Sequence, residues 1–110
     1  MEVRRGALVS IALQGDYGKP RPGLIIQSDN FYELGSFVIL PITSTLVDAP
    51  LLRLTIEPSE TNGLRRRSQI MMDKPMTVRV DKIGQVFGQL EDTHMISVNR
   101  SVALVLGLAG

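Results

Sequence analysis

The stretch KIGQVFGQLEDTHMISVNRSVALVLG, Lys82–Gly107, contains the point at which the hydrophobic pattern of the chain changes. Its first part, residues 82–90, reads as an extended segment and predicts a strand. The part from about residue 92 to about residue 106 predicts a helix, because apolar side chains recur three and four positions apart and share one face. The residues on this face are Met95, Val98, Val102 and Val105.

Both ends of this helix carry suitable residues. Acidic Glu91 and Asp92 lie at the N-terminus, where the positive end of the helix dipole favours negative charge. Gly107 lies just past the last turn, where a left-handed backbone conformation often ends a helix. A single C-terminal helix is therefore expected.

Upstream of this stretch the chain contains six short segments with strand patterns, separated by loops rich in Gly, Pro, Asn and Asp. The clearest is LLRLTIE, Leu51–Glu57, in which Leu52, Leu54 and Ile56 face one way and the residues between them face the other. The other five are GALVSIAL (6–13), GLIIQS (23–28), FVILPITS (37–44), SQIMM (68–72) and MTVRV (76–80).

Two local features lead to more specific expectations. Pro41 has no backbone N–H to donate, so the strand 37–44 is expected at a sheet edge or bulged at this residue. The segment DNFYELGS, residues 29–36, predicts a turn with one helical turn capped by Asp29.

Many short strands followed by one helix predict a mainly β, α+β fold, a small antiparallel barrel closed by the C-terminal helix. The 110 residues fit one domain, 1–110, without repeats or low-complexity segments. A barrel of this length has a modest core. The apolar outer face of its helix or sheet is therefore expected to be shared with a second copy, giving a homodimer.

Composition argues against several classes of site and location. The chain has no cysteine, which rules out disulfides and thiolate zinc sites, and its one histidine, His94, argues against a histidine metal cluster. No apolar run approaches the ~20 residues that a membrane span needs. The N-terminal MEVRRGALVSIAL has no small-residue cleavage site and predicts a strand rather than a signal peptide. A cytoplasmic protein with no metal, no cofactor and no membrane contact is expected.

The formal net charge of +1 conceals an uneven distribution. Residues 61–82 contain six cationic and two anionic side chains, whereas residues 22–60 contain one cationic and five anionic side chains. Nine of the twelve cations in the chain are arginines, whose planar guanidinium groups bind phosphate through paired hydrogen bonds. The basic segment indicates an anionic partner. A solvated face with ordinary ion pairs is the competing interpretation.

Five motifs occur in order along the chain: RRGALVSIAL, the loop ending in PRPGLIIQS, ILPITS, TNGLRRRSQIMMDKPMTV and IGQVFGQL. Each motif alone is common, but together with the C-terminal helix they resemble the MazF/PemK toxins of bacterial type II toxin–antitoxin pairs over essentially the whole chain. The resemblance implies an SH3-like barrel with a C-terminal helix that works as a homodimer. It also implies a metal-independent, sequence-selective endoribonuclease that cleaves single-stranded RNA and is neutralised by a cognate antitoxin.

The resemblance also implies roles for individual residues. The family's catalytic arginine lies in the Arg-Pro step before the second strand, here Arg21, and its partner hydroxyl lies in the PITS motif, here Thr43. Some members use an aspartate before the x-Pro step that follows the Ser-containing strand, and the corresponding residue is Asp73. The chain departs from some members at Met71, where they carry an arginine, and in the first loop, which lacks their histidine.

Metal-free RNA cleavage uses the ribose 2′-OH as the nucleophile. It needs an acceptor for this proton, a donor to the leaving 5′-oxygen, and groups that stabilise the charged phosphorane. Arginine stays protonated, so Arg21 is expected chiefly to stabilise charge. Thr43 is expected to donate a hydrogen bond to a phosphoryl oxygen. Asp73 is the candidate base by motif position alone, and an aspartate before Lys-Pro is also an ordinary turn residue.

The candidate RNA-binding residues are Tyr17, Lys19, Ser44, Arg65, Arg66 and Arg67. Tyr17 and Lys19 lie in a loop that can close over RNA, with the tyrosine ring available to stack on a base. Ser44 supports Thr43. The three consecutive arginines are expected to bind the substrate backbone, with a solvated, ion-paired loop as the alternative. His94 is expected to be structural or exposed.

Two other classes of function stay open at this point. The gyrase-binding CcdB toxins resemble this fold and act by binding a protein, often with tryptophan at the C-terminal contacts, but this chain has no tryptophan and ends in LVLGLAG. An SH3-like module binds proline-rich peptides in an aromatic groove, and this chain has only two tyrosines and three phenylalanines. The cleavage sequence and the identity of the antitoxin follow from none of these motifs.

Overall fold

The computed structural model describes residues 2–12 and 19–110, in which short strands precede a single α-helix. The helix α1 spans Asp92–Val105, close to the predicted limits. The strands are β1 (Ala7–Ile11), β2 (Arg21–Ile25), β3 (Ser36–Thr43), β4 (Arg53–Ile56), β5 (Ser68–Met71), β6 (Met76–Arg79) and β7 (Ile83–Gln89), and 3-10 turns lie at Asp29–Leu34 and Val80–Lys82. The predicted strands, the C-terminal helix and the mainly β, α+β class are confirmed.

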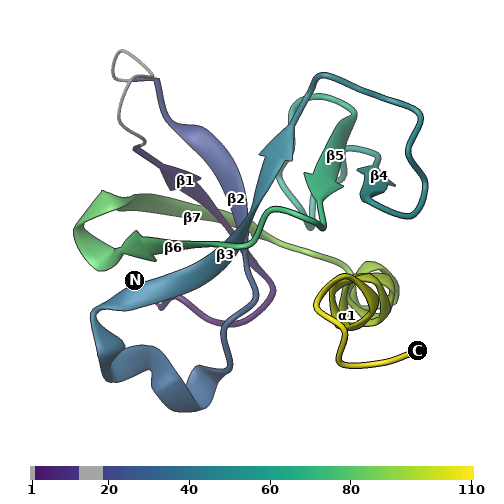
Figure 1. The fold of residues 1–110 in the computed structure, drawn as a ribbon. Coiled ribbons are helices and arrows are strands. Elements are labelled where there is room, and N and C mark those ends of the chain that lie inside the picture. Colours follow the sequence, from purple (N-terminus) through teal and green to yellow (C-terminus); the bar gives the residue numbers. More distant parts are fainter. Residues whose placement is uncertain (1, 13–18) are drawn as a thin grey trace.

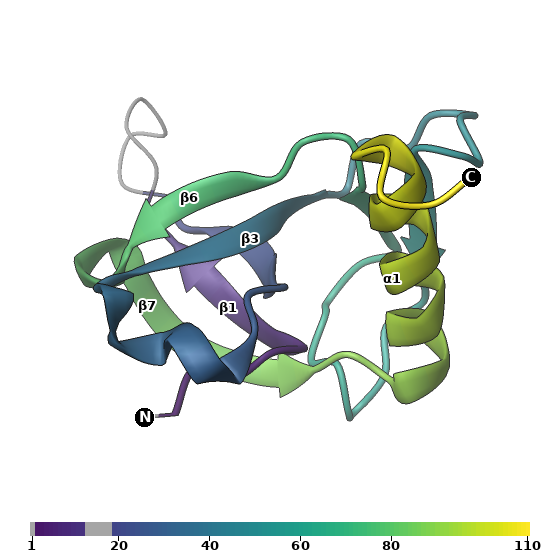
Figure 2. The ribbon, with the colours of Figure 1, turned by 60° about the horizontal axis from the view of Figure 1, so that its bottom comes forward.

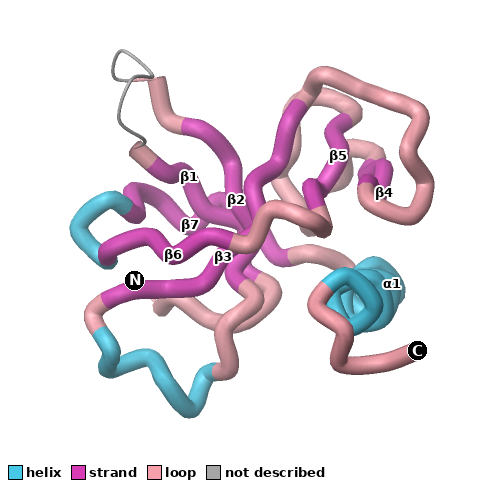
Figure 3. Tube along the Cα trace, in the orientation of Figure 1, coloured by secondary structure: helices cyan, strands magenta, loops and turns pink. Residues whose placement is uncertain are grey.

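All strand pairs are antiparallel, and β3 holds the sheet together. The order of strands is β4-β5-β3-β2-β1-β7, and β6 pairs with β3 off this path. One half-sheet therefore contains β7, β1, β2, β3 and β6, and the other contains β3, β5 and β4. Figures 1 and 3 show the two half-sheets diverging from β3, with α1 beneath the smaller one.

The structure corrects the expectation for Pro41, because β3 is a central strand and its pairings with β2, β5 and β6 show no bulge at this residue. Residues 36–39 pair with β6 and residues 42–43 pair with β5, on the same side of β3. Val38 uses its backbone N–H and carbonyl on the β2 side, so strand alternation directs the nitrogen of Pro41 to the opposite side. On that side the Pro41 nitrogen lies between the end of the β3–β6 ladder and the start of the β3–β5 ladder. The missing N–H thus interrupts no ladder, which explains why a proline is tolerated inside the sheet.

A second correction concerns the turn that follows β2. The segment Asp29–Leu34 forms a 3-10 turn, but its cap is Ser28 rather than Asp29. The Ser28 hydroxyl accepts the backbone N–H of Asn30 at 3.3 Å. The Asp29 carboxylate instead accepts the backbone N–H of Arg5 at 2.7 Å and joins this turn to the N-terminal segment.

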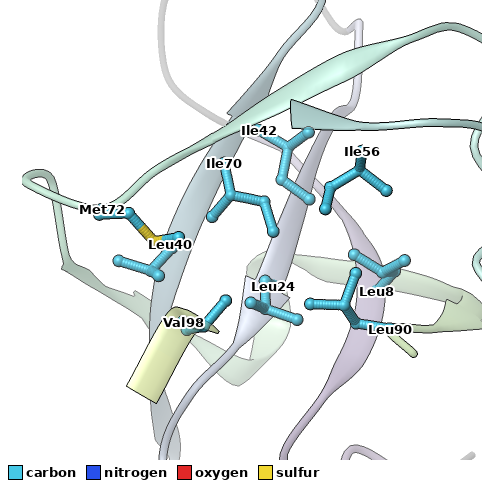
Figure 4. Close-up of a cluster of buried hydrophobic side chains, with 9 residues drawn as sticks. All are labelled: Leu8, Leu24, Leu40, Ile42, Ile56, Ile70, Met72, Leu90 and Val98. Carbon is cyan, nitrogen blue, oxygen red and sulfur yellow. The ribbon is translucent and has the colours of Figure 1, made fainter. Parts of the chain in front are cut away.

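Strand alternation divides the buried side chains into two layers on opposite faces of the sheet. The larger layer packs against α1 and is shown in Figure 4: Leu8, Leu24, Leu40, Ile42, Ile56, Ile70, Met72, Leu90 and Val98. The other layer consists of Ala7, Val9, Ile11, Ile25, Phe37, Ile39, Val78 and Ile83. Because β1, β2 and β3 contribute to both layers, the positions of these three strands are fixed from two sides.

Figure 2 shows α1 beside the strands, and side chains from part of its predicted face pack in the larger layer. Val98 is fully buried, and Met95 and Val102 pack against the layer beside it. Val105 lies in the last turn and is 37% exposed, so the packed face is shorter than the pattern indicated. Gly107 follows the helix with a φ of 73°, as its position predicted. No helix among the described residues is long and apolar enough to cross a bilayer.

Candidate active site

A cleft of about 1020 Å³ opens where both half-sheets meet the loop that precedes β5. It is lined by residues of β1, β2, β3, β5, β6 and β7, together with residues 44–45 and 63–66 of two loops. Apolar side chains such as Ile39 and Met71 form part of the surface, and polar and cationic side chains form the rest. A concave site of this mixed composition is the usual form of a binding site.

Arg21 and Thr43 come from neighbouring strands, and both residues line the cleft. The β2–β3 ladder ends at the pair Gly23 and Pro41, and the two strands separate beyond it (Figure 1). Arg21 and Thr43 each lie two positions past this last pair, so strand alternation directs both side chains to the same face of the sheet. The predicted catalytic pair therefore lies on the two strand ends that border the cleft.

The Thr43 hydroxyl is oriented by the turn that follows β3. Its Oγ1 accepts the backbone N–H of Thr45 at 3.1 Å. A hydroxyl has one proton and two acceptor lone pairs, so this bond occupies a lone pair and leaves the proton for a ligand in the cleft. Ser44 and Thr45 also line the cleft, which gives its rim three successive hydroxyl groups. Such a row suits hydrogen bonds to phosphoryl oxygens.

The charged residues that line the cleft are all arginines, namely Arg21, Arg65 and Arg66. The described lining contains no aspartate, glutamate, lysine or histidine. Arg21 is exposed at the start of β2, and the other two are exposed in the loop before β5. Several guanidinium groups around one concavity favour the binding of an anion. Within residues 2–12 and 19–110, no three acidic or histidine side chains gather closely enough to hold a metal ion.

Two predicted RNA-binding residues, Arg67 and Lys19, do not line the cleft, and a third lies outside the described residues. Arg67 lies outside the lining and forms an ion pair with Glu57, its Nε 2.7 Å from a carboxylate oxygen. Lys19 is exposed on the segment that leads to β2 and also lies outside the lining. Tyr17 falls outside the described residues, so its role stays a prediction.

Asp73 lies in the turn between β5 and β6 and is not among the residues that line the cleft. Its neighbours Met71 and Met76 do line the cleft, so the cleft surface at this turn is apolar. One carboxylate oxygen, Oδ2, is 3.6 Å from the Lys74 ammonium. The other, Oδ1, is buried and has no hydrogen-bond partner among the described residues. The assignment of Asp73 as the base stays a prediction.

Sequence reasoning missed several polar residues of the cleft, among them Ser10, Thr45 and Gln85. The Ser10 hydroxyl accepts the backbone N–H of Gln85 at 2.8 Å. A serine within the apolar run GALVSIAL was an available signal, because a polar group on a buried strand needs a partner. Gln85 offered no signal, since an exposed amide on a strand resembles any surface residue.

Behind the loop that carries Arg65 and Arg66, a polar network joins the start of α1. Glu91, the N-cap residue of the helix, accepts the Ser59 hydroxyl at 2.6 Å and the Asn62 side-chain amide at 3.3 Å. The hydrogen bond from Ser59 is the main cause that lowers the pKa of Glu91, and the Asn62 amide contributes to the same shift. The fold therefore favours the charged carboxylate.

Comparison with known sequences finds two matches that span almost the whole chain. Residues 4–106 match a family model described as PemK-like, MazF-like toxin of type II toxin–antitoxin system. The chain is 42% identical over 109 residues to a probable endoribonuclease MazF of Mycolicibacterium smegmatis, an alignment that covers 98% of this chain and 100% of the relative.

Solved structures with the same fold include toxins bound to their partners. An endoribonuclease in complex with its cognate antitoxin from mycobacterial species superposes with a TM-score of 0.84 at 22% identity, covering 99% of both chains. A MazE–MazF complex from Deinococcus radiodurans gives a TM-score of 0.80 at 18% identity, again covering 99% of both chains. At these identities the likeness confirms the predicted fold.

We expect acid to destabilise the fold partly through Glu91. Its pKa is lowered in the fold, so its stabilising effect is complete above the pKa of an unfolded glutamate, about 4.3, and is lost as the pH falls through the lower folded value. Urea denaturation of the wild type and of Glu91→Gln at about pH 7, 5, 4 and 3 measures this effect. The stability difference between the two proteins should shrink at the acid end. A difference that stays constant with pH would contradict the role given to Glu91.

Proposed function

The chain belongs to the family of PemK-like, MazF-like toxins of type II toxin–antitoxin systems and is an endoribonuclease of that family, and we propose that it cleaves single-stranded RNA in the cleft at Arg21 and Thr43. One observation supports this location above the others. The described cleft lining combines three arginines and a rim of three successive hydroxyl groups with no carboxylate. This set matches the needs of a phosphodiester whose charge increases during the reaction.

In the proposed reaction, the ribose 2′-oxygen attacks the adjacent phosphorus and the bond from phosphorus to the 5′-oxygen breaks. The 2′-OH loses its proton, and the leaving 5′-oxygen gains one. The products are a 2′,3′-cyclic phosphate and a 5′-hydroxyl. The nucleophile comes from the substrate itself, so the protein's part is to position the phosphate and to stabilise the phosphorane. We propose that these steps proceed without a metal ion or cofactor.

Arg21 and Thr43 are proposed to hold the phosphate that is cleaved. The guanidinium presents paired N–H groups to two phosphoryl oxygens and stays charged throughout. The Thr43 proton, left available by the bond from the Thr45 N–H, donates to one of these oxygens. Arg65 and Arg66 are proposed to bind neighbouring phosphates, because they lie in the same cleft.

Asp73 is the candidate acceptor of the 2′-OH proton. The described cleft lining contains no carboxylate or imidazole. Asp73 fits by motif position, but it does not line the cleft, whereas its neighbours Met71 and Met76 do. The structure thus supports Arg21 and Thr43 more strongly than Asp73.

The two competing classes of function are not favoured. The CcdB-like alternative is set aside because the family match is to PemK/MazF toxins and the relative that is 42% identical is named as an endoribonuclease. A module for proline-rich peptides needs an aromatic groove, and Phe87 is the one aromatic residue in the described cleft lining.

RNA and a cognate antitoxin are the partners of this toxin. Structures of related fold include an endoribonuclease with its cognate antitoxin and a MazE–MazF complex. We propose that an acidic, partly disordered segment of the antitoxin folds along the arginine-lined cleft and covers Arg21. Such a complex should weaken as salt is added, and a neutraliser that leaves the cleft open to RNA would rule out this form of inhibition. An RNA substrate places the proposed site of action in the cytoplasm.

We expect Arg21→Ala to lower kcat by at least about 10²–10³-fold while the fold is retained, because a preorganised donor to developing charge is lost. Arg21→Lys should recover only part of the activity, since an ammonium group is a point charge without the planar pair of donors. Cut sites are first mapped on a long transcript, and a labelled RNA oligonucleotide that contains one cut site then serves as the substrate. Initial cleavage rates measure the activity of each variant, and circular dichroism checks that each variant is folded.

Arg79→Ala is the matched control for this experiment. Arg79 is exposed, lies outside the cleft, and pairs with Asp81 at 3.0 Å, so the substitution removes the same charge at a remote place. Its cleavage rate should stay near that of the wild type. Full activity of Arg21→Ala, or an equal loss in both variants, would contradict the assignment. In the same assay Asp73→Asn decides the base, because retained activity removes Asp73 from the reaction.

An RNA whose 2′-OH is replaced by hydrogen at the cut site should resist cleavage, because the proposed nucleophile is missing. An oligonucleotide with the same replacement one nucleotide away is the control and should be cut normally. Mass spectrometry of the products from ordinary RNA should show a 2′,3′-cyclic phosphate and a 5′-hydroxyl. Cleavage of the deoxy substrate at the normal rate would rule out the proposed chemistry.

We expect the toxin to be a homodimer, because many large apolar side chains stay exposed after both core layers are filled. They include Phe31, Tyr32, Leu34, Val80, Ile96, Leu104, Leu106 and Leu108. Exposed apolar surface of this kind marks protein contacts, and twofold dimers are the commonest assemblies. Light scattering at micromolar concentration should give twice the chain mass of 12.1 kDa, and a monomer mass alone would contradict the expectation.

A further inference from the structure

Three polar side chains are buried in the part of the chain that the structure describes, namely Asn62, Ser68 and Gln69. All three lie in β5 or in the loop before it, the same segment that carries Arg65 and Arg66. A buried polar group costs free energy unless its hydrogen bonds are made, so its place in a fold is informative. Ser68 lines the cleft, and Asn62 and Gln69 are each adjacent in sequence to a residue that lines it.

The fully buried Asn62 side chain makes a complete set of hydrogen bonds. Its Oδ1 accepts the backbone N–H groups of Ser59 and Leu64, each at 3.0 Å. Its Nδ2 donates to the Glu57 carbonyl at 2.9 Å and to the Glu91 carboxylate at 3.3 Å. One amide thus closes the loop upon itself and attaches it to the N-cap of α1.

This loop continues directly into Arg65 and Arg66. Gly63 and Leu64 already line the cleft. At the other end of the segment, the Ser68 hydroxyl donates to the Arg66 carbonyl at 2.8 Å. The two arginines therefore project from a backbone that is held on both sides. Preorganisation of this kind reduces the ordering cost when the side chains bind RNA.

The Gln69 side chain also uses its full hydrogen-bonding capacity. Its Oε1 accepts the backbone N–H of Val47 at 3.1 Å and Nη1 of Arg53 at 3.3 Å. Its Nε2 donates to the Val47 carbonyl at 3.0 Å and to Thr55 Oγ1 at 3.2 Å. The two bonds to Val47 have the pattern of a β-bridge, and they hold the segment that follows β3 against β5.

That segment orients the Thr43 hydroxyl. It contains Thr45, whose N–H donates to Thr43 Oγ1, and whose carbonyl lies 3.5 Å from Arg53 Nη1. Gln69 is also the residue paired with Thr43 in the β3–β5 ladder. Removal of the Gln69 amide would break both bonds that hold Val47 against β5, and the Thr45 N–H would be held less firmly relative to the hydroxyl.

We propose that Asn62 and Gln69 are positioning residues for RNA cleavage. Gln69 fixes the hydroxyl of Thr43. Asn62 fixes the backbone that presents Arg65 and Arg66. The inference rests on the proposed function of the cleft. It adds that each amide positions a different part of the cleft and that neither amide contacts the RNA.

Gln69→Met keeps the approximate volume of the side chain and removes its four hydrogen bonds. We expect kcat for the mapped RNA oligonucleotide to fall about tenfold and KM to change less than about twofold, because orientation is lost and RNA binding is not. In a Thr43→Ala background the same substitution should cost less than about twofold, since the hydroxyl that it orients is gone. An equal loss in both backgrounds would show a merely structural role and overturn the proposal.

Two further variants control the Gln69 experiment. Thr55→Val removes one Gln69 bond on the side away from Val47, and Thr55 does not line the cleft. It should lower stability in urea and leave kcat unchanged, whereas a loss like that of Gln69→Met would overturn the proposal. Gln69→Glu keeps an acceptor for the Val47 N–H, and its kcat should lie between those of the wild type and Gln69→Met.

Asn62→Ala tests the other rim of the cleft. We expect KM to rise about tenfold with kcat within about twofold, because the arginines lose their fixed backbone but the Thr43 hydroxyl does not move. The rise should disappear in a background that lacks Arg65 and Arg66. If Asn62→Ala does not fold, Glu91→Gln weakens the same network, and a KM increase of about threefold is then expected. An unchanged KM in folded Asn62→Ala would refute the positioning role of Asn62.

The inference and the proposed function can fail separately. Loss of cleavage in Arg21→Ala, with wild-type constants in folded Gln69→Met and Asn62→Ala, would keep the active site and refute the positioning roles. Full activity in both Arg21→Ala and Thr43→Ala would refute the active site itself, and the positioning roles with it.

Discussion

Strand β3 is shared by two half-sheets, and the rest of the structure depends on this sharing. One side of the strand pairs first with β6 and then with β5, and Pro41 lies at the change of partner. The other side pairs with β2 as far as Gly23 and Pro41, and Arg21 and Thr43 lie just beyond this last pair. The change of partner lets the half-sheets diverge, and the cleft forms between them. The fold and the placement of the proposed catalytic pair therefore have the same origin.

The parts of this molecule that the sequence predicted are those specified by local pattern. Periodicity predicted the limits of the strands and of the helix, and the observed limits agree with nearly all of these predictions within a few residues. The edge position expected for Pro41 was wrong, because which strands share one side of β3 is non-local information. The cap at Asp29 was wrong because Ser28 and Asp29 are both good caps, and a distant contact with the Arg5 N–H engages the aspartate instead.

The candidate site likewise contains features that depend on non-local contacts and that the sequence did not predict. Arg21 and Thr43 were found by motif, but the separation of Arg65 and Arg66 from Arg67 depends on a contact with Glu57 that no spacing rule predicts. The two buried amides escaped notice for a related reason. Asparagine in an Asn-Gly turn and glutamine in a strand both read as surface residues, and only their burial sets them apart. Polar positioning groups are hidden from pattern analysis because composition carries no information on burial.

The composition of the cleft lining affects how the toxin responds to its surroundings. Each RNA phosphate that a guanidinium neutralises releases condensed counterions. On a single strand, the logarithm of the binding constant therefore falls by about 0.7 per neutralised phosphate for each tenfold rise in salt concentration. With the three lining arginines engaged, a threefold rise in salt would weaken binding roughly tenfold. The described lining offers no carboxylate to offset this effect. If the arginines bind RNA as proposed, the affinity of the toxin for RNA would vary with the ionic strength of the cell.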